Sequence, residues 1–204
     1  QISEPFLRHQ GLKKSIANSR AVQMLGLVRI PSAPDRAKEY PHEFSGGMRQ
    51  RAMIAMGLAC SPSLIIADEP TRGLDVTIQA QIVELMKDLI KNSGASMLLI
   101  THDLSLAAQL CDKVAVMYSG EIVEYADIKE FFKGPAHPYA RSFLESVPSR
   151  GMKPIRGISP SLINPPPGCR FHPRCDCSMD ICKSVHPPLT EVKDGQHARC
   201  LLYA

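Results

Sequence analysis

Two kinds of apolar pattern alternate in the first half of the chain. Residues 63–67 and 96–100 are short, mostly aliphatic runs, which predicts buried strands. Between them, residues 77–91 carry apolar side chains at the three- and four-residue spacing of an amphipathic helix. The apolar positions of that helix are Ile78, Ile82, Leu85 and Leu89.

The same alternation continues after the second strand. A helix is predicted over residues 104–111 and a third strand over 114–118, followed by Ser119-Gly120 and a hairpin strand at 121–124. Strand, helix, strand, helix, strand is the order of an α/β fold. We therefore predict that all three strands join one parallel sheet, with the functional residues at the strands' carboxyl ends.

Three candidate catalytic residues follow the first two strands. Asp68 and Glu69 come directly after the first, and His102 comes after the second. An Asp at the end of a strand is where α/β phosphate-binding proteins hold Mg²⁺, and an adjacent Glu can polarise an attacking water. Each feature alone is also typical of a solvated turn or a loop histidine.

A glycine pair precedes another predicted helix, residues 49–60. Ser45 is a suitable N-cap for this helix, and Gly46 and Gly47 would allow the backbone to approach a ligand closely. Such a helix start favours an anion. By itself the motif is more typical of a capped helix after a turn.

Composition indicates a folded chain of 204 residues, with 44% hydrophobic and 22% charged residues. No run approaches the roughly 18 apolar residues of a membrane span, and no signal segment opens the chain, which predicts a soluble protein. The net charge of +4 is too mild to imply nucleic acid.

Residues 151–204 differ in composition from the rest. They hold five of the seven cysteines and eight of the seventeen prolines. Four of these cysteines, separated by five, six and seventeen residues, suggest a metal centre rather than disulfides in an intracellular protein. The spacing lacks the Cys-x₂₋₄-Cys pairs of zinc sites, which favours an iron–sulfur cluster and leaves Zn²⁺ as the alternative. The four are Cys169, Cys175, Cys182 and Cys200.

This tail is predicted to depend on its metal for order, because it has little apolar periodicity. Basic side chains lie close to the cysteines in sequence and are expected to offset a cluster's negative charge and to lower the thiol pKa values. They are Arg170, Arg174, Lys183 and Arg199.

The order of four motifs resembles the ATP-binding subunit of ABC transporters. Ser45-Gly46-Gly47-Met48 is similar to that family's signature loop, the run ending in Asp68-Glu69 to Walker B, Gly73-Leu74-Asp75 to the D-loop, and His102 to the switch histidine. The resemblance implies ATP and Mg²⁺ as cofactors and Glu69 and His102 as catalytic residues. It implies nucleotide contacts by Ser45, Gly46, Gly47, Met48, Asp68 and Asp75.

Ala136-His137-Pro138-Tyr139 and the cysteine-rich tail resemble the C-terminal extension of the oligopeptide/dipeptide importer subfamily. That likeness implies an iron–sulfur cluster on the four cysteines. It also implies a helical subdomain over residues 1–60, the second half of the ATPase core over 61–126 and the extension over 127–204. Arg72-Gly73, where many members have Thr-Ala, is a small departure.

One motif of the family is missing. No Gly in the chain is followed by Lys, so the phosphate-cradling Gly-x-x-x-x-Gly-Lys-Ser/Thr does not occur. The expected fold is therefore a partial P-loop NTPase core. In this family two subunits sandwich ATP, so the signature residues would serve a nucleotide seated on a partner.

The leading hypothesis is an ATPase subunit, peripheral at the cytoplasmic face of the membrane, that energises import of peptides or a related solute such as nickel. Implied partners are a second ATPase subunit, transmembrane permease subunits and, indirectly, a solute-binding protein; nucleic acid is not expected. Two alternatives stay open. One is a metal-binding interaction module with a catalytically inactive core. The other is a non-transport ABC ATPase acting on DNA or ribosomes, against which the His-Pro-Tyr motif and the tail argue.

Overall fold

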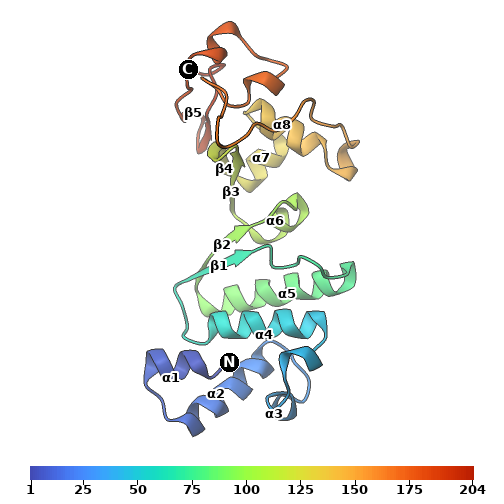
Figure 1. Cartoon of the computed structure of the whole chain (residues 1–204), viewed down its shortest axis with the longest axis vertical. Helices are drawn as coiled ribbons and strands as arrows, with labels where there is room; N and C mark the ends of the chain where they lie inside the picture. The colour runs from blue at the N-terminus through green and yellow to red at the C-terminus, as the bar shows by residue number, and fades with distance from the viewer. The chain divides into compact units, whose positions relative to one another are not determined.

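The computed structural model describes all 204 residues apart from the side chain at position 149. The chain forms two compact units, Gln1–Leu106 and Ala107–Ala204, and helix α6 spans their boundary. The elements in Figure 1 are α1 Glu4–Gln10, α2 Lys14–Leu27, α3 Ala33–Arg36, η1 Pro41–Glu43, α4 Gly46–Leu58, β1 Leu64–Asp68, α5 Val76–Ser93, β2 Ser96–Ile100, α6 Leu104–Leu110, β3 Lys113–Tyr118, β4 Glu121–Asp127, α7 Ile128–Lys133, α8 Pro138–Glu145, η2 Pro148–Arg150, η3 His172–Arg174, η4 Asp180–Lys183, β5 Thr190–Lys193 and β6 Gln196–Ala198.

The first unit places β1 beside β2 as a parallel pair, with α5 as the connection between them (Figure 1). The positions of the predicted strands and helix are confirmed to within two residues at each end, but the strands are not buried as predicted, since their residues alternate between exposed and half-buried. Asp75 caps α5 by accepting a hydrogen bond from the Ile78 backbone N–H at 3.0 Å. Gly94 ends the helix in the left-handed region, at φ 67°.

The core of this unit joins α5 to the preceding helices. Its buried side chains come from α2, α4, α5 and the segments between α2 and α4. Ile65 of β1 packs against the same core, so one face of the parallel pair lies toward the helices. The largest members of the core are Leu25, Val28, Ile30, Phe44, Leu58, Leu85 and Leu89.

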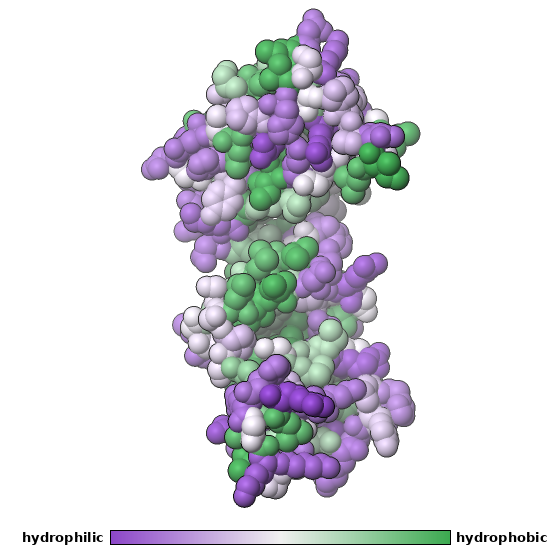
Figure 2. All heavy atoms as spheres, turned by 60° about the vertical axis from the view of Figure 1, so that its left-hand side comes forward, coloured by the Kyte–Doolittle hydropathy of each residue, from purple (hydrophilic) through white to green (hydrophobic). Residues whose placement is uncertain are grey.

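The other face of the parallel pair is apolar and exposed. Leu64 and Ile66 of β1 are 52% and 64% exposed, and Leu98 and Ile100 of β2 are 51% and 47% exposed. The register pairs Ile66 with Leu98, so these side chains share one face. Figure 2 shows hydrophobic side chains gathered at the level of these strands. Parallel sheets normally bury both faces, so this face needs a covering surface.

The second unit is built on an antiparallel sheet of order β3-β4-β6-β5. The predicted hairpin is confirmed, and Ser119 and Gly120 at its turn both have positive φ, 48° and 81°. The prediction that the strand at 114–118 joins the parallel sheet is wrong. This strand, β3, pairs with β4 instead, because a two-residue turn makes antiparallel pairing local.

The tail is ordered by packing on the residues before it. Strand β6 pairs with β4 and β5 pairs with β6, so the end of the chain extends the hairpin sheet. Phe171 is 2% exposed and lies against the rings of Tyr118 and Tyr139, with centroids 5.1 Å and 5.4 Å away. The expectation that the tail depends on a metal for order stays a prediction, because these contacts show where the tail packs and not what it needs in order to fold. The tail has few apolar residues, but they pack against side chains of β3 and α8.

Among the described residues, no helix has both the length and the apolar character needed to cross a membrane.

Candidate active site

A polar cavity of about 620 Å³ lies where β1 and β2 end. Its lining comes from two loops, one between β1 and α5 and one between β2 and α6. The two loops meet because β1 and β2 are parallel neighbours, so their carboxyl ends share one sheet edge. The lining residues are Glu69, Thr71, Arg72, Gly73, Gln79, Thr101, His102 and Asp103.

Glu69 and His102, the two predicted catalytic residues, are brought together here. Nδ1 of His102 lies 2.7 Å from Oε1 of Glu69, and the His102 backbone N–H donates to the same oxygen at 3.2 Å. Glu69 has φ 46°, a left-handed conformation that is uncommon outside glycine. Its backbone is held from both sides, since its N–H donates to Ile100 and its carbonyl accepts from Arg72. The backbone from which the Glu69 carboxylate extends is therefore held in place, and His102 orients the carboxylate.

The two predicted aspartates lie apart from this pair. Asp68 is exposed, and it does not line the polar cavity. Asp75 is engaged as the N-cap of α5. A magnesium site that uses Asp68 together with Glu69 thus stays a prediction.

The signature-like residues form the start of α4. Ser45 caps the helix, its Oγ accepting from the Met48 backbone N–H at 3.3 Å. A Cβ on Gly47 would lie 2.8 Å from Cγ2 of Ile78, so this glycine lets α4 approach α5 closely. The glycine pair was predicted to allow close approach of a ligand, and the structure adds this packing role. None of these four residues lines the cavity at Glu69.

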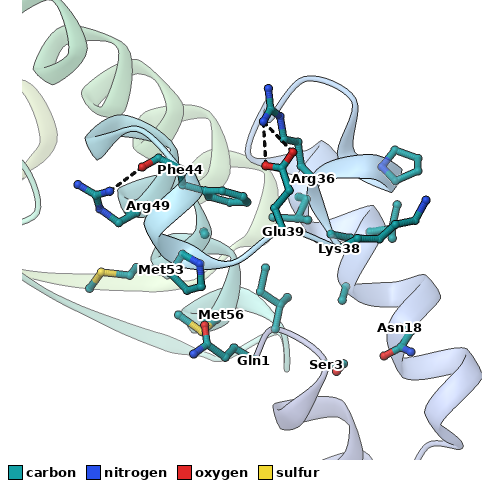
Figure 3. A pocket seen from close by; sticks show the side chains of 18 residues that line it. Gln1, Ser3, Asn18, Arg36, Lys38, Glu39, Phe44, Arg49, Met53 and Met56 are labelled. Atoms are coloured by element: carbon teal, nitrogen blue, oxygen red, sulfur yellow. Dashed lines mark hydrogen bonds and ion pairs between the residues drawn. The ribbon is translucent and has the colours of Figure 1, made fainter.

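A second, more apolar cavity of about 510 Å³ lies among α2, α3 and α4 (Figure 3). All three of its basic side chains are engaged: Arg36 is paired with Glu39 at 2.8 Å, and Arg49 donates to the carbonyl of Phe44. The third, Lys38, reaches Asp35 at 3.4 Å. Without an acid and base placed like Glu69 and His102, this cavity is not the candidate for the chemistry.

The four tail cysteines converge in the second unit. The charge of Cys182 acts on Cys169, and Cys169 and Cys200 both act on Cys175, in each case raising the thiol pKa. The backbone N–H of Cys169 also donates to the carbonyl of Cys182 at 2.9 Å. Among the described residues, however, no three His, Cys, Asp or Glu side chains are placed so that they could hold a metal ion. The predicted metal centre is therefore not confirmed.

The expected lowering of the cysteine pKa values is wrong. Burial is the main cause that raises the pKa of Cys169 and Cys200, and it raises the pKa of Cys175 to about 11. The basic side chains that were expected to lower these values have other partners. Arg170 is paired with Glu121 at 3.0 Å, Lys183 with Asp180 at 2.8 Å, and Arg174 and Arg199 donate to backbone carbonyls.

A buried polar network joins the His-Pro-Tyr helix to the sheet. Glu124 of β4 is fully buried, and its carboxylate accepts from the backbone N–H groups of Ala136 and His137 at 3.0 Å and 2.7 Å. Gln196 of β6 donates to the same carboxylate at 3.0 Å. Nδ1 of His137 accepts from the Tyr139 N–H and so caps α8. These bonds satisfy a carboxylate that would be costly to bury alone.

Acid should weaken this network through His137. Burial lowers the pKa of His137 to about 4 from 6.5, so the unfolded chain takes up this proton first as pH falls. Stability that is present above pH 6.5 should be lost on acidification through pH 4, by up to roughly 3 kcal/mol. His137→Asn keeps an N-cap acceptor without titrating in this range and should flatten the loss, as measured by urea unfolding with tyrosine fluorescence.

Glu130→Gln provides the control for this measurement. Lys133 and Lys193 lower the pKa of Glu130 to about 2, so its contribution is lost between pH 4.5 and 2. Its replacement should leave the slope between pH 6.5 and 4.5 as in the parent chain. An unchanged slope in His137→Asn would contradict the assignment.

Comparison with known proteins gives two family matches. Residues 3–72 match the ABC transporter family, and residues 123–182 match the family described as oligopeptide/dipeptide transporter, C-terminal region. The second match includes the network at Glu124 and His137 and three of the four cysteines.

Similarity to curated proteins extends over the full chain. The oligopeptide transport ATP-binding protein AppD of Bacillus subtilis is 49% identical over 100% of this chain and 63% of its own length. The chain is a homologue of the oligopeptide and dipeptide transport ATP-binding proteins. The dipeptide transport ATP-binding protein DppD of Bacillus subtilis is 47% identical over 99% of the chain. OppD of Escherichia coli is 46% identical over 98%. The chain spans about three fifths of the length of these relatives.

Solved structures show the α/β fold of an ABC ATPase cassette. CbiO1 from Clostridium perfringens, part of the ABC transporter complex cbiONQ, matches with a TM-score of 0.57 and 28% identity over 65% of this chain and 51% of its own. A bacterial ABC transporter cassette, MJ0796, whose structure is dimeric, matches with a TM-score of 0.50 and 28% identity over 57% of this chain and 49% of its own.

Sequence reasoning did not predict the other polar residues of the cavity. Thr71, Gln79, Thr101 and Asp103 line it beside Glu69 and His102. Their nearness in sequence to the two predicted residues is the signal that could have found them. Arg72 stood out only as a departure from the family pattern.

Proposed function

We propose that this chain forms part of the ATP-binding subunit of an ABC importer for peptides or a related small solute such as nickel. The observation that carries the proposal is the contact of Glu69 with His102 at the joined ends of β1 and β2. It gives a carboxylate base and a histidine in one polar cavity, in a homologue of peptide-transport ATP-binding proteins.

In this proposal Glu69 takes a proton from the water that attacks the γ-phosphate of ATP. His102 orients the Glu69 carboxylate and reaches the same phosphate. Asp68 contributes a ligand to Mg²⁺, and Asp75 supports the loop that precedes α5. When bound, the metal ion neutralises charge that develops on the phosphate oxygens.

The start of α4 serves a different nucleotide. Ser45, Gly46, Gly47 and Met48 form the N-terminus of helix α4, which suits a phosphate. They do not line the cavity at Glu69. We assign them to ATP held by a second ATPase subunit, and this division requires a homo- or heterodimer.

Further partners follow from the same proposal. The ATPase dimer would sit at the cytoplasmic face of the membrane, bound to transmembrane permease subunits, with a solute-binding protein acting indirectly. Residues 1–60 would be the helical subdomain, 61–126 the second half of the ATPase core and 127–204 the C-terminal extension. The exposed apolar face of β1 and β2 supports a larger core in the assembled subunit.

The extension would hold an iron–sulfur cluster on Cys169, Cys175, Cys182 and Cys200. The support is their convergence: each of the four thiols is electrostatically coupled to at least one other. Zn²⁺ is the alternative. Either would tie together segments that are far apart in the sequence.

The purified 204-residue chain should bind ATP poorly and not hydrolyse it. The sequence has no Gly-x-x-x-x-Gly-Lys-Ser/Thr loop, which supplies most phosphate contacts in such ATPases. Calorimetry with ATP and Mg²⁺ should show no saturable binding in the micromolar range typical of specific sites. The complete subunit, assembled with its permease, should hydrolyse ATP faster in the presence of transported peptide. Tight ATP binding by the isolated chain would contradict this prediction.

A further inference from the structure

The loop between β1 and α5 places one free cation in the wall of the active-site cavity. Arg72 lines this cavity and is exposed. Among the described residues, its guanidinium has no hydrogen-bond or ion-pair partner. It is also the only lysine or arginine in the described lining.

The other charged groups of the cavity are already engaged. Glu69 accepts from both the ring and the backbone of His102. Asp103 accepts from the backbone N–H groups of Ser105 and Leu106, at 2.8 Å and 3.3 Å, at the start of α6. Arg72 is therefore the charged group that is available to a ligand.

The backbone of the loop is fixed, so the position from which Arg72 extends is fixed as well. The Arg72 N–H donates to the carbonyl of Glu69 at 3.1 Å, which closes a turn directly on the catalytic residue. Thr71 is buried, and its carbonyl accepts from Leu74 and from the side chain of Gln79 on α5. The Arg72 side chain therefore extends from a position three residues after Glu69, on a loop that is hydrogen-bonded to helix α5.

We propose that Arg72 binds a phosphate group in this cavity, either the γ-phosphate of ATP or the phosphate released from it. This inference rests on the proposed function. A phosphate beside Glu69 and Asp103 meets two carboxylates, and a guanidinium offsets that repulsion while offering a donor fork that matches phosphate oxygens. Arg72 is a phosphate-binding residue in this proposal, and Glu69 remains the base.

The test measures inhibition of ATP hydrolysis by inorganic phosphate in the complete subunit assembled with its permease. Arg72→Ala should raise the half-inhibiting phosphate concentration about tenfold or more, since hydrogen bonds to charged groups are worth that factor. Arg72→Lys keeps the charge without the fork and should lie between Arg72→Ala and the parent. Arg20→Ala, on the exposed surface of α2, is the control and should behave like the parent. Circular dichroism melting checks that each variant is folded.

The outcomes separate this inference from the proposed function. If Arg72→Ala and Arg20→Ala are inhibited at the same phosphate concentration while Glu69→Gln is inactive, the role of Arg72 is wrong and the proposed function stands. If Glu69→Gln hydrolyses ATP like the parent, the proposed function itself fails. A loss of phosphate inhibition in Arg72→Ala with rescue by Arg72→Lys supports both.

Discussion

Glu69→Gln should lower ATP turnover of the assembled subunit at least about a hundredfold, since a general base contributes about 10²–10⁴ to a rate. The variant should still bind nucleotide. Gln has the shape of Glu and keeps an oxygen where Oε1 accepts from His102, so the contact between the two loops survives. Only the ability to take a proton from water is removed. Single-turnover hydrolysis measures the chemical step, and nucleotide retention on the purified complex measures binding.

Glu84→Gln is the matched control for this substitution. Glu84 lies on α5, is exposed and pairs with Lys87 at 2.9 Å, so the same chemical change occurs away from the cavity. It should leave turnover unchanged. His102→Ala should also reduce hydrolysis, because Glu69 then loses the ring that orients it. If Glu69→Gln matched the parent in single-turnover hydrolysis, the catalytic assignment would be wrong.

The parallel pair at this site was predictable because the apolar residues of each of its elements form a clear pattern. Residues 63–67 and 96–100 are short apolar runs, and the helical spacing over 77–91 could belong to no strand. Parallel order then predicts that Glu69 and His102 lie at one edge of the sheet. Their direct contact at 2.7 Å depends on the left-handed backbone of Glu69, which no pattern in the sequence reveals.

The second unit was harder to predict because the period of apolar residues does not reveal which strands pair with one another. The strand period of residues 114–118 is the same whether the partner is parallel or antiparallel, and the Ser119-Gly120 turn decides in favour of the hairpin. Glu124 and Gln196 were missed for a related reason. A charged or amide residue in a strand is normally assigned to the exposed face, and only the three-dimensional fold brings the N–H groups of α8 to Glu124.

The cysteine pKa values illustrate a limit of reading charge from sequence neighbours. Arg170 and Arg174 are next to cysteines in the chain, yet their guanidinium groups are held by Glu121 and by backbone carbonyls. Burial then dominates and raises the pKa of the Cys169, Cys175 and Cys200 thiols. Binding of any metal must release their protons, so metal affinity should rise with pH.

Gly168→Ala should separate Cys169 from Cys182 and destroy the proposed metal centre. A Cβ on Gly168 would clash with the carbonyl oxygen of Cys182 and lie 2.8 Å from the backbone nitrogen of Ser184. Both are backbone atoms, so the segment before Cys169 must move away from η4. The hydrogen bond from the Cys169 N–H to the Cys182 carbonyl would then break.

Gly151→Ala isolates the effect of this clash. Gly151 also has positive φ, 103°, but a Cβ there meets no atom within 4 Å. Both variants carry the backbone cost of a left-handed alanine, about 1–2 kcal/mol. Gly168→Ala adds overpacking, which typically costs about 1–3 kcal/mol more. Its tail should therefore be cleaved by protease at concentrations that leave Gly151→Ala and the parent intact.

The metal content of the same two variants tests the cluster. The parent and Gly151→Ala, purified without oxygen, should be brown and contain iron and sulfide in similar amounts, whereas Gly168→Ala and Cys182→Ser should be colourless. A colourless parent with stoichiometric zinc would assign the four cysteines to Zn²⁺ instead. A parent with neither metal would show that the proposed metal centre does not exist. Protease sensitivity still reports on the Gly168 clash in each case, because β6 pairs with β4 and Phe171 packs on Tyr118 outside the proposed centre. Loss of colour in Gly168→Ala and Cys182→Ser but not in Gly151→Ala would place the ligands on both sides of the contact between Cys169 and Cys182.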